Sequence, residues 1–216
     1  MERGRTLKSP AATGQAAPRV RLDREERRRQ IVESCSDLIA TRGYSNTSLR
    51  DVAAHVGIST GTLLHHYRSK EELLVATLLA VSDDFVEHIE EAIRRSKDPV
   101  RRLQAIVRAL LESPRHDVGW RVWIAFWHEA ALNPELAKLA SERTDLAESL
   151  LAGVIRDGRE TGRLSCPDPE LAAAELAALV DGVALRLYGE SGRWSRRQAI
   201  GVLDRLIGDW TVDGSA

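Results

Sequence analysis

Residues 48–67, SLRDVAAHVGISTGTLLHHY, constrain the fold of this chain more than any other stretch. Apolar residues recur at helical spacing through its first half, and Ser48 is placed to cap that helix. Gly57 occupies the position where a helix ends in a left-handed residue, and Ser59 can cap a second helix with Leu63 on its buried side. The stretch predicts a helix-turn-helix, the unit with which many proteins read DNA, although ordinary helical hairpins share the pattern.

The charge of the chain is unevenly distributed around this motif. Residues 1–70 contain 13 Lys and Arg against 7 Asp and Glu, a net charge of +6, whereas the remaining residues contain 18 against 25, a net charge of −7. The whole chain of 216 residues therefore has a net charge of only −1. A basic segment that coincides with a helix-turn-helix indicates a protein that meets a polyanion with one end.

The rest of the sequence predicts helices separated by short breaks. Leu, Ala, Arg and Glu are abundant, only 7 residues are Pro, and no stretch reads convincingly as a strand. Start signals that combine a cap residue with Pro stand at Asp98, Asn133 and Asp168. We expect an all-α protein with a loop at residues 113–119 and about nine helices, at residues 23–42, 48–56, 59–67, 69–95, 98–112, 120–132, 133–161, 171–188 and 195–210.

The helices divide the chain into a tail and two parts. Residues 1–22 lack an apolar period and predict a disordered basic tail, whose Arg and Lys side chains either contact DNA or are simply solvated. Residues 23–70 predict a three-helix DNA-binding domain with one small core. Residues 71–212 predict an acidic helical body, which the long helix at its start joins to the basic domain.

Several classes of protein are disfavoured by what the sequence lacks. No apolar run is long enough to span a membrane and no signal peptide follows the basic N-terminus, so we expect a cytoplasmic protein. Cys35 and Cys166 are far apart and suggest no disulfide. His128 and Glu129 begin an HExxH motif, but Leu132 stands where the second His would be. We therefore expect no catalytic residues, no metal site and no cofactor.

Small and apolar residues in the last two predicted helices suggest a dimer. They lie on one face of each helix, where a second helix could approach closely, and two copies would form a four-helix interface. Packing within one chain explains the same pattern equally well. The residues are Ala173, Ala177, Val180 and Ala184 in the first helix, and Ile200, Leu203, Leu206, Ile207 and Trp210 in the second.

Three tryptophans share one face of the predicted helix at residues 120–132. Trp120, Trp123 and Trp127 recur at i, i+3 and i+7, a spacing that is more often part of a core. Several indole faces beside an acidic residue can instead enclose a quaternary ammonium group by cation–π attraction. The acidic candidates are Glu112, Asp117 and, foremost for a ligand site, Glu129.

The motifs taken together resemble known regulators. The basic part resembles the TetR family of transcriptional repressors over residues 25–85, through Thr47-x-Leu49-x-Asp51-Val52-Ala53, Gly57-Ile58-Ser59-x-Gly61-x-Leu63, His66-Tyr67 and Lys70-x-x-Leu73. The body is similar, more loosely, to the BetI-like branch, whose namesake represses choline-to-betaine genes. The body motifs are Trp123-x-Ala125-Phe126-Trp127, Pro134-x-Leu136 and Leu179-Val180-Asp181-Gly182-x-x-Leu185-Arg186, with Arg27-Arg28-Arg29-Gln30 before the first helix.

This resemblance implies a homodimeric repressor that binds a palindromic double-stranded DNA operator. It implies that residues 71–212 form an effector-binding and dimerisation domain and that a small molecule releases the DNA. The sequence leaves the identity of this effector open, and a quaternary ammonium such as choline is one candidate. The alternatives are a DNA-binding activator or ligand-independent regulator, and a helical interaction protein whose basic end binds another acidic partner. The resemblance places DNA contacts, within a motif at residues 48–67 and its flanks, at Thr47, Ser48, Ser59, Thr60, Gly61, Thr62, Leu64, His65, His66 and Lys70.

Three residues depart from the pattern of the TetR family. Leu64 stands in place of a frequent Tyr, Tyr67 in place of a usual Phe, and Thr60 in place of a common Lys. Leu64 and Thr60 lack the long polar side chains with which Tyr and Lys can contact DNA. Leu64 and the methyl group of Thr62 can instead pack on thymine methyl groups. We therefore expect an operator that differs from that of a typical member.

Overall fold

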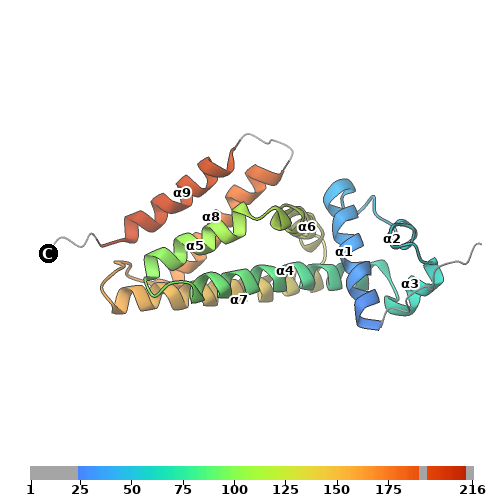
Figure 1. The fold of residues 1–216 in the computed structure, drawn as a ribbon, viewed down its shortest axis with the longest axis horizontal. Helices are drawn as coiled ribbons and strands as arrows, with labels where there is room; N and C mark the ends of the chain where they lie inside the picture. The colour runs from blue at the N-terminus through green and yellow to red at the C-terminus, as the bar shows by residue number, and fades with distance from the viewer. Residues whose placement is uncertain (1–23, 190–193, 213–216) are drawn as a thin grey trace, which may run out of the picture.

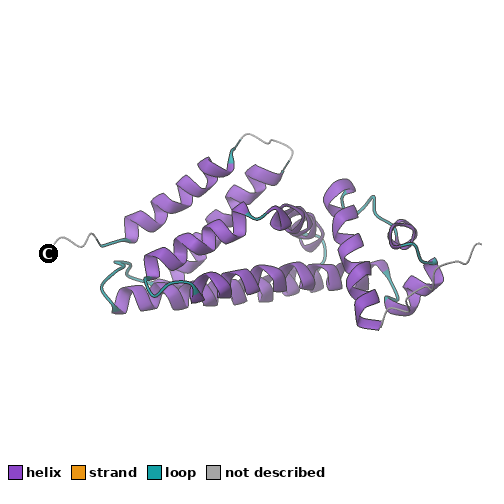
Figure 2. Cartoon of the chain, in the orientation of Figure 1, coloured by secondary structure: helices purple, strands orange, loops and turns teal. Residues whose placement is uncertain are grey.

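Nine α-helices make up the part of the chain that the structure describes, residues 24–189 and 194–212 (Figures 1 and 2). The structure is a computed structural model. It confirms the predicted all-α fold, and the predicted tail at residues 1–22 lies outside the described residues. The helices are α1 (Arg24–Arg42), α2 (Leu49–Val56), α3 (Thr60–His66), α4 (Lys70–Arg94), α5 (Pro99–Glu112), α6 (Pro114–Ala130), α7 (Pro134–Glu160), α8 (Pro169–Tyr188) and α9 (Arg196–Trp210).

The predicted helix-turn-helix is formed by α2 and α3. Ser48 caps α2 through a capping box, because its hydroxyl accepts from the Asp51 amide at 3.2 Å while its own amide donates to the Asp51 carboxylate at 2.9 Å. Gly57 ends α2 with φ of 75°, the left-handed conformation that Gly adopts at least cost. The hydroxyl of Ser59 then caps α3 by accepting from the Thr62 amide at 3.0 Å. The sequence predicted all three turn-forming residues correctly.

The long helix α4 connects helices α1, α2 and α3 to the body (Figure 1). The Ser69 hydroxyl caps α4 by accepting from the Glu72 amide at 3.1 Å, and the Glu72 carboxylate accepts from the Arg68 amide at 2.7 Å. Its first turns pack against α1, and its later turns pack against α5, α6 and α7. A single helix therefore joins the buried residues of the N-terminal helices and of the body in one continuous hydrophobic core.

The predicted loop at residues 113–119 is wrong, because α6 begins at Pro114. Ser113 and Pro114 repeat the sequence pattern of a cap residue followed by Pro found at the heads of α5, α7 and α8, although the Ser113 side chain makes no capping hydrogen bond. Gly119, which suggested a loop, is buried within α6, and a Cβ atom there would lie 3.2 Å from the ring of Phe85 on α4. The glycine marks a close approach of two helices.

The small-residue faces that suggested a dimer instead pack within the chain. Ala173, Val180 and Ala184 of α8 are buried, as are Ile200, Leu203, Ile207 and Trp210 of α9, while Ala177 and Leu206 are partly buried. This burial follows from the packing of α8 against α7, α6 and α9. The outward face of α8 instead exposes Leu171 and Leu185, at 58% and 53%. Within the described residues, no helix is long and apolar enough to cross a membrane.

Candidate DNA-binding surface and effector cavity

The candidate reading surface is the outward side of α3. Leu63 is fully buried and fixes the rotation of the helix, so that Thr60, Gly61, Thr62 and His65 are all exposed on the other side. Leu64 is 42% exposed, which is unusual for a large apolar side chain and leaves it free to contact another molecule. The side chains predicted to meet bases therefore share one accessible surface. Gly61 offers its backbone there without a side chain in the way.

The flanking residues divide between exposed caps and internal contacts. Ser48 and Ser59 are exposed, and each hydroxyl caps its helix. Thr47 is buried, and its hydroxyl donates to the carbonyl of Gly43 at 2.9 Å. The ammonium group of Lys70 donates to the carbonyl of Tyr44 at 2.7 Å and lies 4.0 Å from the centre of the Tyr44 ring. The side chains of Thr47 and Lys70 thus stabilise the turn between α1 and α2. For either residue to make its predicted phosphate contact, its side chain would have to move or its backbone amide would have to make the contact.

The end of α3 is tied to α1 by a residue that the sequence indicated only as part of a basic run. The Arg28 guanidinium donates to the carbonyl of His66 at 2.8 Å and lies 4.4 Å from the centre of the Tyr67 ring. His66 is partly buried, and its Nδ1 atom has no hydrogen-bond partner. Burial and the neighbouring positive charges, His65 first among them, lower the pKa of His66. The lowered pKa favours the neutral form of this ring.

A cavity of about 80 Å³ lies in the body between α4, α5, α6, α7 and α8. Most of its walls are apolar, and Phe85 of α4 and Trp120 and Trp123 of α6 contribute aromatic rings. Trp120 is held in place by its indole nitrogen, which donates to the carbonyl of Leu110 at 2.9 Å. The polar residues at the walls are Ser82, Arg143, Thr144 and Asp181.

Asp181 of α8 is the acidic residue of this cavity. Burial raises its pKa to about 6, with a smaller contribution from the charge of Glu148, while a hydrogen bond with the side chain of Trp123 acts in the opposite direction. The cationic group at the wall, Arg143, is already engaged with the hydroxyl of Ser82 and the carboxylate of Asp83. The Asp181 carboxylate is thus available to a cationic ligand.

A second hollow of about 290 Å³ lies outside the first, between α6 and α8. Trp120, Trp123 and Asp181 line both spaces, and Trp127 lines only the outer one. The rings of Trp123 and Trp127 meet edge to face, with centroids 6.1 Å apart, and Trp127 is 41% exposed. The tryptophans on this face of α6 therefore serve in two ways. Trp120 and Trp123 are buried in the hydrophobic core, and the same two side chains line both spaces.

The acidic residues suggested by the sequence lie elsewhere. Glu129 lines neither space, and its charge instead acts on Tyr44 of the DNA-binding domain, where it contributes after burial and Glu71 to raising the pKa to about 12. Asp117 pairs with Arg196 at 2.5 Å, and Glu112 also lines neither space. The sequence did not indicate that Asp181 lines the cavity, because Asp181 lies on a different helix from the tryptophans.

A helix-turn-helix with an exposed reading helix, joined through one long helix to a body with a cavity, defines a DNA-binding transcriptional regulator. Residues 31–77 match the family described as bacterial regulatory proteins, tetR family, and residues 99–210 match the domain described as BetI-type transcriptional repressor, C-terminal. The chain belongs to the tetR family and has a BetI-type C-terminal domain. Regulators of this type bind DNA operators, form dimers and bind small-molecule effectors.

Individual relatives agree with this assignment over most of the chain. The chain is 34% identical to the HTH-type transcriptional regulator BetI of Burkholderia lata, over 76% of this chain and 82% of that protein. It is 26% identical to the regulator of the same name from Yersinia pestis, over 84% and 90%. Its structure is similar to that of a transcriptional regulator from Saccharomonospora viridis in complex with choline, with a TM-score of 0.79, 29% identity and coverage of 85% of this chain and 96% of that chain.

Proposed function

We propose that this protein is a transcriptional repressor that choline or a closely related quaternary ammonium compound releases from its operator. The observation that carries this proposal is the Asp181 carboxylate beside Trp120 and Trp123, at the wall shared by the two spaces. The choline complex of the Saccharomonospora viridis regulator, which has a similar fold, supports it. No observation favours a non-DNA acidic partner.

The walls of the cavity suit the chemistry of a quaternary ammonium ion. Such an ion has no N–H group to donate, so a protein holds it by aromatic faces and a counter-charge. Trp123 and Trp120 supply the faces and Asp181 supplies the charge. Thr144 also lines the cavity, and its hydroxyl is buried without a hydrogen-bond partner. A buried hydroxyl of this kind is costly, and a ligand with a hydroxyl group, such as choline, would satisfy it.

The position of the cavity explains how a ligand would reach the DNA. Phe85 and Ile89 of α4 form part of the wall, and α4 begins at Lys70 inside the DNA-binding domain. A ligand that fits only one arrangement of these side chains favours the corresponding position of α4. In a dimer on a palindromic site the two reading helices must be about 34–36 Å apart, so a shift of α4 weakens binding.

The proposed DNA contacts belong to the exposed residues of α3 and its flanks. Gly61, Thr62, Leu64 and His65 would face bases, and the caps Ser48 and Ser59 would lie near the phosphates. Thr60 and His66 would contribute at either end of α3, and Thr47 and Lys70 would act mainly by holding the turn that positions α2.

The test is a titration of the protein–operator complex, with a labelled palindrome from the region upstream of its own gene. Choline should lower operator affinity, whereas the neutral isostere, in which a tert-butyl group replaces trimethylammonium, should not. Trp123→Leu should weaken the choline response by at least tenfold, since each desolvated cation–π contact contributes roughly 2 kcal/mol. Asp209→Asn, which removes an exposed carboxylate outside both spaces, is the control. Unchanged operator affinity at saturating choline would overturn the proposal.

A further inference from the structure

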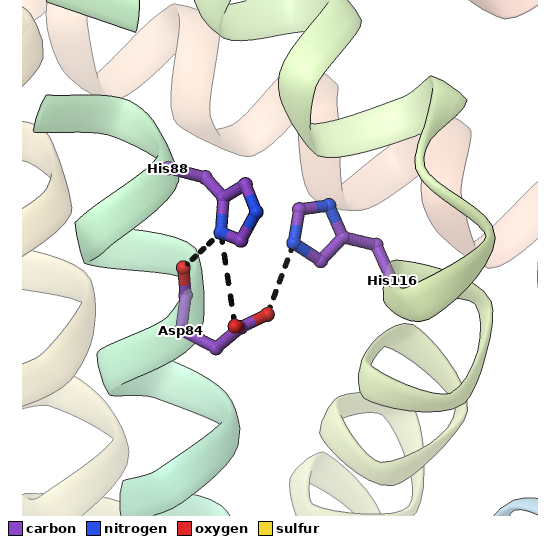
Figure 3. Close-up of side chains that lie close together, drawn as sticks. All are labelled: Asp84, His88 and His116. Atoms are coloured by element: carbon purple, nitrogen blue, oxygen red, sulfur yellow. Dashed lines mark hydrogen bonds and ion pairs between the residues drawn. The ribbon is translucent and has the colours of Figure 1, made fainter. Parts of the chain in front are cut away.

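Asp84, His88 and His116 form a cluster of ionisable side chains that lines neither of the two spaces described above (Figure 3). Asp84 and His88 lie one turn apart on α4, and His116 lies in the first turn of α6. One nitrogen of each imidazole and one carboxylate oxygen lie within 4.8 Å of one another. The side chain of His116 is only 1% exposed, while those of Asp84 and His88 are 41% and 28% exposed. The cluster is therefore anchored in the core and accessible from solvent.

Backbone carbonyl groups fix the tautomers of both histidines. Nδ1 of His116 lies 2.8 Å from the carbonyl oxygen of Ala109, and Nδ1 of His88 lies 2.7 Å from the carbonyl oxygen of Asp84. A carbonyl oxygen only accepts, so each Nδ1 must carry a proton, and in a neutral ring Nε2 then presents a lone pair. Histidines that bind metals usually donate their other N–H to a backbone carbonyl or a carboxylate in this way.

The spacing of two potential ligand atoms already matches one metal ion. Nε2 of His116 lies 3.1 Å from Oδ2 of Asp84. Two ligands of a tetrahedral Zn²⁺ ion, each at about 2.0–2.1 Å, lie about 3.3–3.4 Å from one another. His88 is the third candidate, and its ring meets that of His116 edge to face with centroids 4.5 Å apart. Nδ1 of His88 faces Asp84, 3.7 Å from its Oδ1 atom and bonded to its carbonyl oxygen, so His88 would rotate about its side-chain bonds to present Nε2 to the ion (Figure 3).

The charges around the cluster also favour a cation. Among the described residues, the ion-pair partners of the Asp84 carboxylate are His88 and His116 alone, with no Lys or Arg. No Lys or Arg side chain of the described residues therefore competes with a bound cation for this carboxylate.

We propose that Asp84, His88 and His116 bind a divalent transition-metal ion, for which Zn²⁺ is the best match in ligand type and spacing. Three protein ligands leave a fourth position for water on the exposed side of the cluster. The ion would connect α4 to α6, and both helices pack against α1 of the DNA-binding domain. The proposed role of the ion is to fix these helices relative to one another, which raises the stability of the chain.

No motif in the sequence indicates this site. Asp84 and His88 stand at i and i+4, but such pairs are common on helix surfaces, and His116 falls in the stretch that was predicted to be a loop. The site therefore departs from our expectation of a chain without a metal site. It exists only because α6 begins at Pro114 and brings His116 against α4.

The test uses the full-length chain, freed of any affinity tag and treated with a chelator. Zn²⁺ is titrated by calorimetry, and Co²⁺ is added in parallel because its visible absorption bands report tetrahedral coordination. We expect one equivalent of Zn²⁺ to bind with a dissociation constant in the micromolar range or below, and to raise the thermal unfolding temperature. Asp84→Asn and His88→Ala should each weaken binding at least tenfold.

Matched controls make the outcome decisive. His128→Ala removes an exposed histidine of α6 outside the cluster and should bind Zn²⁺ like the unchanged protein. The two cluster variants alter partly exposed side chains, and circular dichroism checks that they fold. Binding that is unaffected by both Asp84→Asn and His88→Ala would place the metal elsewhere and overturn the proposal. The absence of saturable one-to-one binding by the unchanged protein would also overturn it.

Discussion

Replacing Asp181 with Asn should abolish the choline response and, without choline, should make the protein more stable. Burial raises the pKa of this carboxyl group from 3.8 to about 6, which means that the ionised form is less favourable in the folded chain than in the unfolded chain. One pKa unit corresponds to about 1.4 kcal/mol, and the shift therefore costs up to about 3 kcal/mol of unfolding free energy when the group is ionised. The amide has a similar shape and avoids this cost.

The dependence on pH has a definite sign. The raised pKa means that the folded state binds more protons than the unfolded state between about pH 4 and pH 6, so this group lowers stability as pH rises through that window. Asp181→Asn should therefore stabilise the chain by up to about 3 kcal/mol near pH 7.5 and by roughly half of that near pH 5. Choline affinity should follow the fraction of carboxylate, falling about tenfold between pH 7.5 and pH 5.

Urea unfolding at the two pH values measures the first effect, and calorimetric titration of choline measures the second. Asp209→Asn serves as the matched control, because its carboxylate is exposed on α9 and should change neither quantity. If the Asp181→Asn variant has the same free energy of unfolding as the unchanged protein at both pH values, the ionised Asp181 does not destabilise the fold. If choline affinity is the same at both pH values, Asp181 is not its counter-charge.

Three further substitutions test other parts of the structure. Leu64→Ala should weaken operator binding only at sites where the contacted position is T, measured by titrating a set of operator variants, and uniform weakening would contradict a direct contact. Gly119→Val should lower the unfolding free energy by about 1–3 kcal/mol, since even its Cβ would lie 3.2 Å from the ring of Phe85, and an unchanged urea midpoint would argue against the close approach. Leu185→Glu should shift the dimer toward monomer in sedimentation experiments, because Leu185 is 53% exposed on the outward face of α8. Leu132→Glu, at a 76% exposed position between α6 and α7, should leave the dimer unchanged.

Local signals in the sequence predicted most of the helices. Caps such as Ser48, Ser59 and Asn133 act through neighbouring residues, so their effect is readable without knowledge of the fold. Gly119 led to the wrong prediction of a loop, because its role is a close contact with α4 that depends on residues distant in sequence. The orientation of α8 was undetermined for the same reason, since small residues suit a neighbouring helix of the same chain as well as one of a partner.

The candidate sites also differ in whether they depend on local signals or on contacts between distant residues. The exposed side of α3 could be predicted because one helix carries it and Leu63 fixes its rotation. The effector cavity could be predicted only in part, since the tryptophans share α6 but their acidic neighbour belongs to α8. A pattern along one helix identified the aromatic half, and only the packing of helices identified Asp181.

The continuity of α4 also limits the kinds of motion available to this regulator. About 22 Å of unbroken helix separates the cavity wall at Phe85 from Lys70 in the DNA-binding domain. Such a helix acts as a lever, and a tilt of about 5° around the cavity would move its far end by about 2 Å. The cavity can therefore change its ligand preference through side chains while the mechanical link to DNA stays the same. Substitutions in the cavity and substitutions on α3 can therefore change effector specificity and operator specificity separately, while α4 continues to connect them.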